Sequence, residues 1–168
     1  ESASGLGVDV GLTLKPADSL QLRLALGWND LTLDHAVTSD ELLAGDVLFE
    51  EGERLNESAE TTAGLAADYF FPLGSSRFEG QISGSAHYYT ELVSRSAVPG
   101  AVVFGRGDDV LNTRLDFTVR SARHWTASVF ADNLTNEDNI VRAGPFGFLL
   151  FGLSTERPRP RAIGVQFE

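Results

Sequence analysis

The 168-residue sequence contains no cysteine and no methionine. The absence of cysteine excludes a disulfide framework and a cysteine-based zinc site. Basic residues are scarce, with 13 Lys and Arg against 24 Asp and Glu, a formal net charge of −11. This balance argues against a nucleic-acid-binding protein, which needs a basic surface to displace counterions from phosphate. No apolar run reaches the roughly 20 residues of a membrane-spanning helix.

Glycine and phenylalanine are plentiful, with 17 Gly and 11 Phe, a composition that favours strands and turns. The mean hydropathy of −0.06 is close to neutral. A soluble protein has such an average, and so does a transmembrane β-barrel, because only alternate residues of its strands face lipid.

Apolar and polar residues alternate with a period of two through most of the chain. In residues 6–14 and 20–28, every even position is Leu, Val or Trp. An amphipathic helix would repeat every three or four residues, whereas period two is the pattern of a strand with two different faces. The same alternation predicts five further strands, over residues 63–71, 78–88, 111–119, 125–131 and 163–167.

Two segments depart from this pattern. After Trp28 the apolar positions move to Leu31 and Leu33, which predicts a bulge near Asn29 and Asp30. Farther along, residues 146–153 form an apolar run inside a polar connection. This run packs on a neighbouring loop, contacts a ligand, or forms an eighth strand.

Short and long connections alternate along the chain. Turn-like links are expected at residues 16–19, 73–76 and 121–124, and long links at about 35–58, 92–108 and 137–156. An outer-membrane barrel has the same alternation, with tight turns on one side and long external loops on the other. The last strand then runs toward the side of the short turns.

The predicted strands carry aromatic residues near their ends and polar residues on one of their two faces. Aromatic residues near both strand ends predict girdles at two membrane interfaces, although aromatic residues end strands in other β proteins too. The predicted girdle residues are Trp28, Tyr69, Phe71, Phe78, Tyr88 and Trp125. Polar residues on the inward face predict a lumen lining, formed by Arg23, Asp68, Glu79, Gln81, Arg114 and Asp116.

Motifs of catalysis and metal binding are missing from the sequence. His35, His87 and His124 have no partner at a metal-ligand spacing, and neither a phosphate loop nor a nucleophile elbow is present. We therefore predict no enzyme, no metal and no cofactor. Residues 40–60 hold eight acidic residues against Arg54. This segment either attracts divalent cations that bridge lipopolysaccharide or is a charged, solvated loop.

The two ends of the chain carry motifs of a known family. Asn133-Leu134-Thr135 follows the strand that begins at Trp125, and an Arg-Pro-Arg run at 157–161 leads into Ile163 and Gly164. At the other end, a strand that begins at Gly5 leads to a turn at Pro16 and then to a second strand over Leu20–Asp34, which contains Gly-Trp-Asn-Asp at 27–30. Together these motifs resemble the closing strands of TonB-dependent outer-membrane receptors. The resemblance implies an all-β, antiparallel, up-and-down transmembrane β-barrel.

In that family, residues 1–168 would be the C-terminal portion of the barrel, about seven strands of an incomplete barrel without the plug domain. A full receptor has about 22 strands, so we expect a fragment or a truncated gene product. The resemblance implies a receptor of the bacterial outer membrane that imports a scarce nutrient such as an iron chelate, cobalamin or a carbohydrate. The alternatives are a complete small eight-stranded barrel and a soluble lipocalin-like binding protein.

The resemblance also implies partners. They are outer-membrane lipid and lipopolysaccharide, the remainder of the barrel and its plug, TonB through a part on the N-terminal side, and the barrel-assembly machinery. Gly164, Val165 and Phe167 would belong to the end-strand signal that this machinery recognises. The residues that contact the transported ligand are not identified by the sequence.

Overall fold

The computed structural model describes residues 2–39, 46–74, 77–122, 124–145 and 153–168. These residues form eleven strands: β1 (Ala3–Ala17), β2 (Leu20–Leu33), β3 (Thr61–Pro72), β4 (Phe78–Tyr89), β5 (Val93–Val98), β6 (Ala101–Arg106), β7 (Val110–Ser121), β8 (Thr126–Asp132), β9 (Arg142–Pro145), β10 (Leu153–Glu156) and β11 (Ala162–Phe167). A search of the same residues for a helix able to cross a membrane found none.

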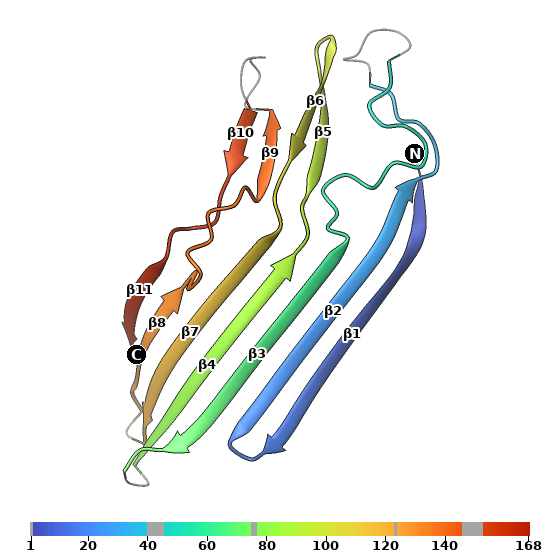
Figure 1. Cartoon of the computed structure of the whole chain (residues 1–168). Helices are drawn as coiled ribbons and strands as arrows, with labels where there is room; N and C mark the ends of the chain where they lie inside the picture. The colour runs from blue at the N-terminus through green and yellow to red at the C-terminus, as the bar shows by residue number, and fades with distance from the viewer. Residues whose placement is uncertain (1, 40–45, 75–76, 123, 146–152) are drawn as a thin grey trace.

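Seven of the strands form one sheet, in the order β1-β2-β3-β4-β7-β8-β11. Every neighbouring pair in this sheet is antiparallel, so the chain runs up and down across it (Figure 1). The all-β, antiparallel, up-and-down architecture predicted from the alternation is therefore confirmed for the described residues, as is the number of sheet strands. β1 and β11 are the two edges of the sheet and do not pair with each other.

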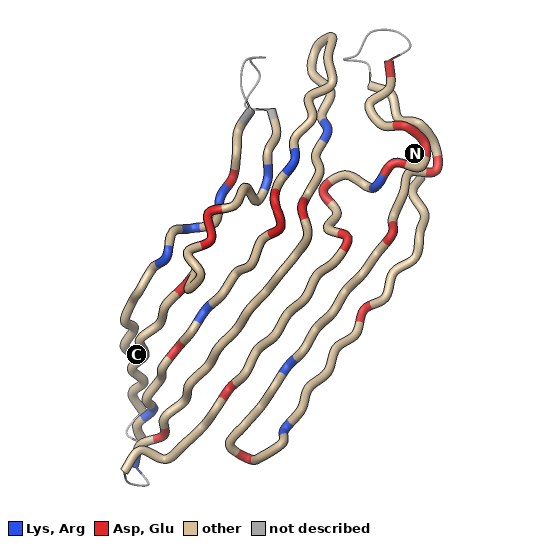
Figure 2. The backbone as a smooth tube through the Cα atoms, in the orientation of Figure 1, with Lys and Arg blue, Asp and Glu red and all other residues tan. Residues whose placement is uncertain are grey.

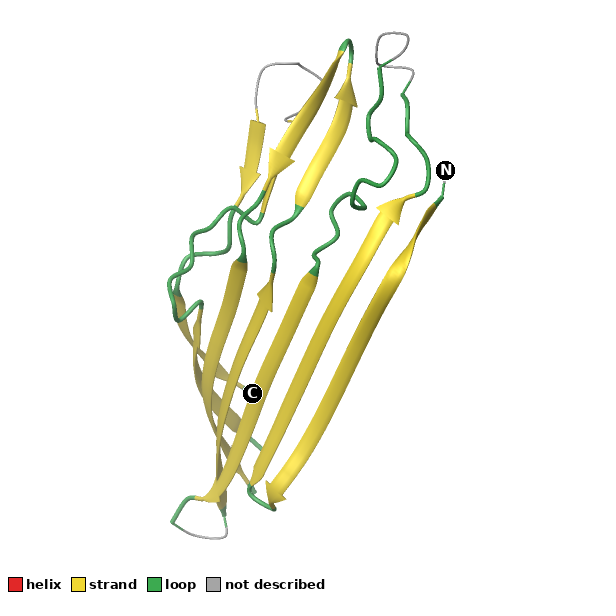
Figure 3. Cartoon of the chain, turned by 45° about the vertical axis from the view of Figure 1, so that its right-hand side comes forward, coloured by secondary structure: helices red, strands yellow, loops and turns green. Residues whose placement is uncertain are grey.

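The connections fall at opposite ends of the sheet according to their length. The links β1–β2, β3–β4 and β7–β8 are short and lie together at one end, called the short-turn end (Figures 1 and 3). The links β2–β3, β4–β7 and β8–β11 are long and lie at the other end, called the long-connection end. This arrangement agrees with the prediction, and β11 runs toward the short turns.

The sequence led us to expect three long loops, but two of the long connections contain additional strands. The β4–β7 connection contains the hairpin β5–β6, and the β8–β11 connection contains the hairpin β9–β10. β9 lies against both β5 and β6. Of the apolar run 146–153, only Leu153 belongs to the described residues. It begins β10 and pairs with β9 rather than with the large sheet, so β10 is not an eighth sheet strand.

The predicted bulge near Asn29 and Asp30 is wrong. β1 and β2 pair without interruption from Leu14↔Leu22 to Ala3↔Leu33, and the register shifts only beside the turn, between Leu14 and Ala17. The change of apolar phase after Trp28 has another cause. Past the first residue of β3, the Leu33 N–H donates to the Glu53 carbonyl, and the carbonyls of Leu33 and Leu31 accept from the N–H groups of Gly52 and Leu55. Leu33 is buried there.

The burial of side chains is inverted relative to a soluble β-sandwich. Among the described residues, the buried apolar side chains are Leu33, Val110 and Ala143, none of them in the middle of the large sheet. Leu65, Leu115 and other large apolar side chains of the sheet are exposed, whereas Asp68 is buried. A sheet with such an exposed apolar face requires an apolar medium or partner to cover it.

Candidate functional site

The register of the strands places the apolar positions of all seven sheet strands on one face. One row that crosses the whole sheet consists of Leu14, Leu22, Ala67, Gly84, Leu115, Ala131 and Ile163, each paired with the next. The neighbouring row joins Leu12, Leu24 and Leu65 directly. Because side chains alternate along every strand, a slip of one residue in any pair would break this face. We call it the apolar face.

Aromatic side chains form two groups of contacts on the apolar face near the short turns. Tyr69 stacks on Phe71, with 5.6 Å between the ring centres. Phe78 lies 5.9 Å from Trp125, which in turn stacks on Phe167 at 6.0 Å. The first contact lies within β3, whereas the Phe78–Trp125–Phe167 contacts join β4, the residue before β8, and β11. Each contact is worth about 0.5–1.5 kcal/mol beyond its buried area. Four of the predicted girdle residues thus lie near one end of the sheet.

The other two predicted girdle residues lie toward the long-connection end and direct their polar atoms into acidic groups. Trp28 Nε1 donates to Glu60 Oε1 at 3.3 Å, and the Tyr88 hydroxyl donates to Asp109 Oδ2 at 2.6 Å. Amphipathic rings of this kind place an apolar body beside apolar surface and a polar tip beside water. The sequence predicted the positions of the rings but not these partners.

The Tyr88–Asp109 contact is expected to be pH-dependent. The hydrogen bond from Tyr88, followed by that from the Glu91 backbone N–H, holds the pKa of Asp109 below its usual 3.8. A lowered folded-state pKa means that the contact contributes fully above the unfolded-state pKa and is lost as the pH falls through the folded-state value. Exchange of the Glu91 amide hydrogen should therefore accelerate below about pH 4.

The Tyr88→Phe variant provides the control for this titration. It removes the largest cause of the lowered pKa, so the Asp109 carboxyl should titrate nearer its usual value and the acceleration should begin at higher pH. Amide exchange that, after correction for its intrinsic pH dependence, is the same in both proteins between pH 2 and 6 would contradict the assignment.

The face opposite the apolar face carries a hydrogen-bonded network centred on Asp68. Its carboxylate accepts from Arg23 Nη2 at 2.6 Å, from Gln81 Nε2 at 2.9 Å and from Ser83 Oγ at 2.6 Å. These four residues come from β2, β3 and β4, so the network ties three strands together. The Asp68 side chain is only 12% exposed, whereas that of Arg23 is 54% exposed. We call this side of the sheet the polar face.

A second network lies on the polar face of β7, β8 and β11. Arg114 pairs with Asp116 at 2.6 Å and with Asp132 at 2.7 Å. The guanidinium of Arg114 also lies 4.5 Å from the centre of the Phe130 ring. That ring covers Gly164 so closely that a side chain there would overlap it. Arg114, Phe130 and Gly164 therefore hold the last strand against its neighbours.

The predicted lumen residues are thus brought onto one face, but in separate groups. Arg23, Asp68 and Gln81 form the first network, and Arg114 and Asp116 belong to the second. The remaining one, Glu79, lies near the short turns and pairs with Arg120 at 3.5 Å.

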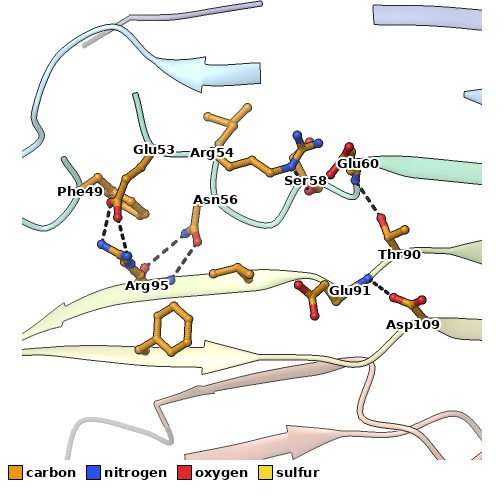
Figure 4. A pocket seen from close by; sticks show the side chains of 13 residues that line it. Phe49, Glu53, Arg54, Asn56, Ser58, Glu60, Thr90, Glu91, Arg95 and Asp109 are labelled. Atoms are coloured by element: carbon orange, nitrogen blue, oxygen red, sulfur yellow. Dashed lines mark hydrogen bonds and ion pairs between the residues drawn. The ribbon is translucent and has the colours of Figure 1, made fainter. Parts of the chain in front are cut away.

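At the long-connection end, Arg95 of β5 joins two connections that are far apart in the sequence. Its guanidinium pairs with Glu53 at 2.6 Å and lies 5.8 Å and 5.6 Å from the centres of the Phe49 and Phe104 rings (Figure 4). Asn56 binds the Arg95 backbone from the same side, accepting from its N–H at 2.9 Å. This cluster could not be predicted from the sequence, because its members are up to 55 residues apart and share no period.

A cavity of about 440 Å³ lies beside this cluster. Its lining comprises Phe49, Glu53, Arg54, Leu55, Asn56, Ser58, Glu60, Thr90, Glu91, Val93, Arg95, Phe104 and Asp109. Both arginines have partners, since Arg54 Nη2 donates to Asn29 and Arg95 pairs with Glu53. Acidic residues are frequent around this end of the sheet (Figure 2). The lining is therefore polar and net negative, with aromatic and aliphatic side chains between the charges.

The hairpins at this end approach each other through glycine. A side chain at Gly105 of β6 would overlap the carbonyl oxygen of Ala143 in β9, whereas one at Gly144 would have room, with Ser94 Oγ nearest at 3.8 Å. We expect Gly105→Ala to weaken the contact between the hairpins by about 1–3 kcal/mol, because backbone cannot yield as a side chain can. Faster proteolysis of the long connections would report this, and Gly144→Ala should leave the rate unchanged.

The other candidate residues are dispersed. His35, His87 and His124 lie on different segments, and the described residues contain no group of three His, Cys, Asp or Glu side chains suited to a metal ion. Val165 and Phe167 lie on the exposed apolar face of β11, and Gly164 lies beneath Phe130 on the polar face. The acidic segment 40–60 lies only partly within the described residues, since residues 40–45 are outside them.

The arrangement can separate an apolar medium from a polar space, and its candidate functional surfaces are therefore the two faces of the sheet and the long-connection end. Comparison of the chain with models of protein families, with curated proteins and with solved structures found no match.

Proposed function

We propose that the chain forms part of the wall of an outer-membrane β-barrel, as the C-terminal barrel segment of a TonB-dependent receptor. The observation that carries this proposal is the apolar face, which crosses all seven sheet strands without a charged residue in its central row from Leu14 to Ile163. The described residues provide no cover for this face, and lipid around a membrane barrel would supply that cover.

The dimensions of the strands support the proposal. The apolar alternation spans nine residues on β1, from Leu6 to Leu14, and nine on β2, from Leu20 to Trp28. A tilted strand needs about 9–11 residues to cross the hydrocarbon layer. Aromatic residues lie near both limits of this span, as they do at the two interfaces of membrane barrels.

The polarity of the two faces argues against a lipocalin-like binding protein. Such a protein turns its apolar side chains inward around a ligand, and its outer surface is polar. Here large apolar side chains such as Leu65 and Leu115 are exposed, and the Asp68 and Arg114 networks lie on the opposite face, where the Asp68 side chain is only 12% exposed. That distribution suits a wall between lipid and a water-filled or protein-filled interior.

In a receptor of this family, the wall would surround a plug, and the long connections would face the outside. The chain would then contribute barrel wall and external loops to the import of a scarce nutrient such as an iron chelate, cobalamin or a carbohydrate. Its partners would be lipid, lipopolysaccharide, the plug, and the barrel-assembly machinery acting on Gly164, Val165 and Phe167. TonB would be reached through the plug side of the receptor.

Single-cysteine labelling tests the membrane location, because the chain has no native cysteine. Spin labels at 65 and 67 on the apolar face of β3 should collide with lipid-soluble oxygen, and labels at 64 and 66 should collide with a water-soluble nickel chelate. Equal exposure of odd and even positions would exclude a lipid-facing wall. The receptor assignment is tested separately by the coding sequence on the N-terminal side of residue 1, where further amphipathic strands and a plug are expected.

A further inference from the structure

The cavity at the long-connection end adjoins the limit of the apolar face. Two of the carboxylates that line it, Glu60 and Asp109, are the acceptors of the hydrogen bonds from Trp28 and Tyr88. Both rings occupy apolar positions of the large sheet, in β2 and β4, at the end where the long connections begin. The cavity is therefore open to a molecule that has both an apolar and a polar part.

Glu60 and Asp109 lie on either side of the link between β4 and β5. Thr90 Oγ1 accepts from the Glu60 backbone N–H at 3.0 Å, and Asp109 Oδ1 accepts from the backbone N–H of Glu91 at 3.0 Å (Figure 4). Within the described parts of the chain, both carboxylates accept from neutral donors only and pair with no basic side chain. Their two negative charges are therefore not neutralised by the protein around the cavity.

The arginines of this region are engaged by other acceptors. Their pairs are Arg95 with Glu53 at 2.6 Å, Arg106 with Glu91 at 2.6 Å, and Arg54 with Asn29 at 2.7 Å. A ligand in the cavity would thus meet two carboxylates that lack a counter-charge and guanidinium groups that already have acceptors. An anion would be repelled there, and a cation would be attracted.

Apolar side chains form the wall that leads away from these carboxylates. Val93 lies two residues before Arg95 in β5, so both side chains point to the same side of that strand. Phe104 is the direct partner of Arg95 in β6, and it remains 50% exposed beside the guanidinium. The volume of about 440 Å³ lies within the range of about 300–1,000 Å³ that is usual for small-molecule sites.

A bare metal ion does not fit this arrangement. The described residues contain no group of three His, Cys, Asp or Glu side chains able to hold one. An ammonium group carries three N–H donors and can serve carboxylates that lie apart. An apolar body attached to it would replace water along the wall of the cavity.

We propose that the cavity binds an organic ammonium ion, with its charged group between Glu60 and Asp109 and its apolar body along Val93 and Phe104. Such an ion is either a soluble amine that enters from the side of the long connections or the amine headgroup of a lipid whose chains lie on the apolar face. The site itself does not depend on the receptor assignment. Only the lipid source rests on the proposed membrane location.

Calorimetric titration of the full chain in non-ionic detergent micelles tests the requirement for charge. Phenethylamine carries an ammonium group on an apolar ring, phenethyl alcohol has the same body without the charge, and hydrocinnamate carries a negative charge instead. The amine should bind about 10–100-fold more tightly than the alcohol, since hydrogen bonds to charged groups are the stronger ones. Hydrocinnamate should bind more weakly than either. Equal binding of amine and alcohol, or no binding of the amine, would overturn the proposal.

Variants of the two carboxylates test the location of the site. Glu60→Gln and Asp109→Asn remove one charge each but keep an acceptor for the neighbouring ring, and each should weaken phenethylamine binding about 10-fold. Glu51→Gln is the matched control, because Glu51 belongs to the same connection as Glu60 but does not line the cavity. An equal loss in the control would show that net charge attracts the amine, and the proposed site would be wrong. The comparison of the three probes uses the unmodified chain, so it decides the question even where a variant does not fold.

The source of the amine is distinguished by lipid competition. Phosphatidylethanolamine added to the micelles should displace phenethylamine if the site takes a lipid headgroup, and its N-acetylated form, which lacks the ammonium, should not. Failure of both lipids to displace the probe would support a soluble amine, whereas equal displacement by both would contradict recognition of the ammonium group. The spin labels on β3 report the membrane location independently. A chain that binds the amine without lipid contact would therefore retain this site and lose the proposed function.

Discussion

Leu24→Arg is expected to lower the free energy of unfolding of the chain in detergent micelles by about 2–4 kcal/mol, the cost of an arginine at the lipid-facing midplane of a membrane barrel. Leu24 lies in the central part of the apolar face, paired directly with Leu12 on one side and Leu65 on the other. Its side chain is already 37% exposed in the isolated sheet. In a protein that faces water, the same substitution would fall within about 0.5 kcal/mol.

The adjacent residue provides a matched control for this substitution. Ala25 lies on the polar face of the same strand and pairs with Gly11 and Gly64, so a long side chain has room there. Ala25→Arg should therefore cost much less than Leu24→Arg. Urea unfolding followed by tryptophan fluorescence measures both. Equal costs for the two variants would show that the two faces meet the same medium, and would remove the basis of the proposed function.

The sequence predicted the large sheet well because its two faces follow one simple rule. Alternation with a period of two identifies a strand, and it also restricts the register, since a slip of one residue would move the apolar side chains to the other face. The row from Leu14 to Ile163 obeys this rule. Length did the rest, because links of four residues permit only a hairpin between neighbouring strands.

Alternation led to a wrong prediction where β2 forms backbone hydrogen bonds with a connection instead of a neighbouring sheet strand. Leu31 and Leu33 read as a bulge, but they remain in register with β1 and take residues 52–55 as neighbours on the other side. Residues 52–55, which bind this part of β2, do not alternate between apolar and polar residues in a way that predicts a strand. The sequence therefore showed that the apolar positions shift after Trp28, but not why they shift.

The hairpin β5–β6 was missed although it left a signal. Pro99 and Gly100 stand between two apolar segments, and such a pair favours a tight turn. Gly100 has a φ of +77°, which the second central position of a type II turn requires. The hairpin β9–β10 gave no comparable signal, because each of its strands has only four residues. The Arg95 cluster joins two long connections without a periodic pattern, and it could therefore not be predicted from the sequence either.

Charged residues on the polar face contribute more to stability than charged residues in the long connections. The long connections carry acidic residues in water, where single pairs contribute little. On the polar face, Asp68 is hydrogen-bonded by three side chains and is mostly removed from solvent. A carboxylate in that position is costly to leave unpaired and equally costly to remove, because its donors then lose their acceptor.

Asp68→Ala is accordingly expected to lower the free energy of unfolding by about 2–3 kcal/mol, because charge-assisted hydrogen bonds are each worth about 1.5–3 kcal/mol and Arg23 recovers part of its loss in water. Asp68→Asn keeps an acceptor for Gln81 and Ser83 but not the charge that holds Arg23, and should cost roughly half as much. The double variant with Arg23→Ala separates the ion pair from the rest of the network. If Asp68→Ala costs no more than Asp132→Ala, whose side chain is 41% exposed, then Asp68 does not join the three strands. In that case the polar face would be a solvated surface and not a packed one, and the sheet would depend on its apolar face alone.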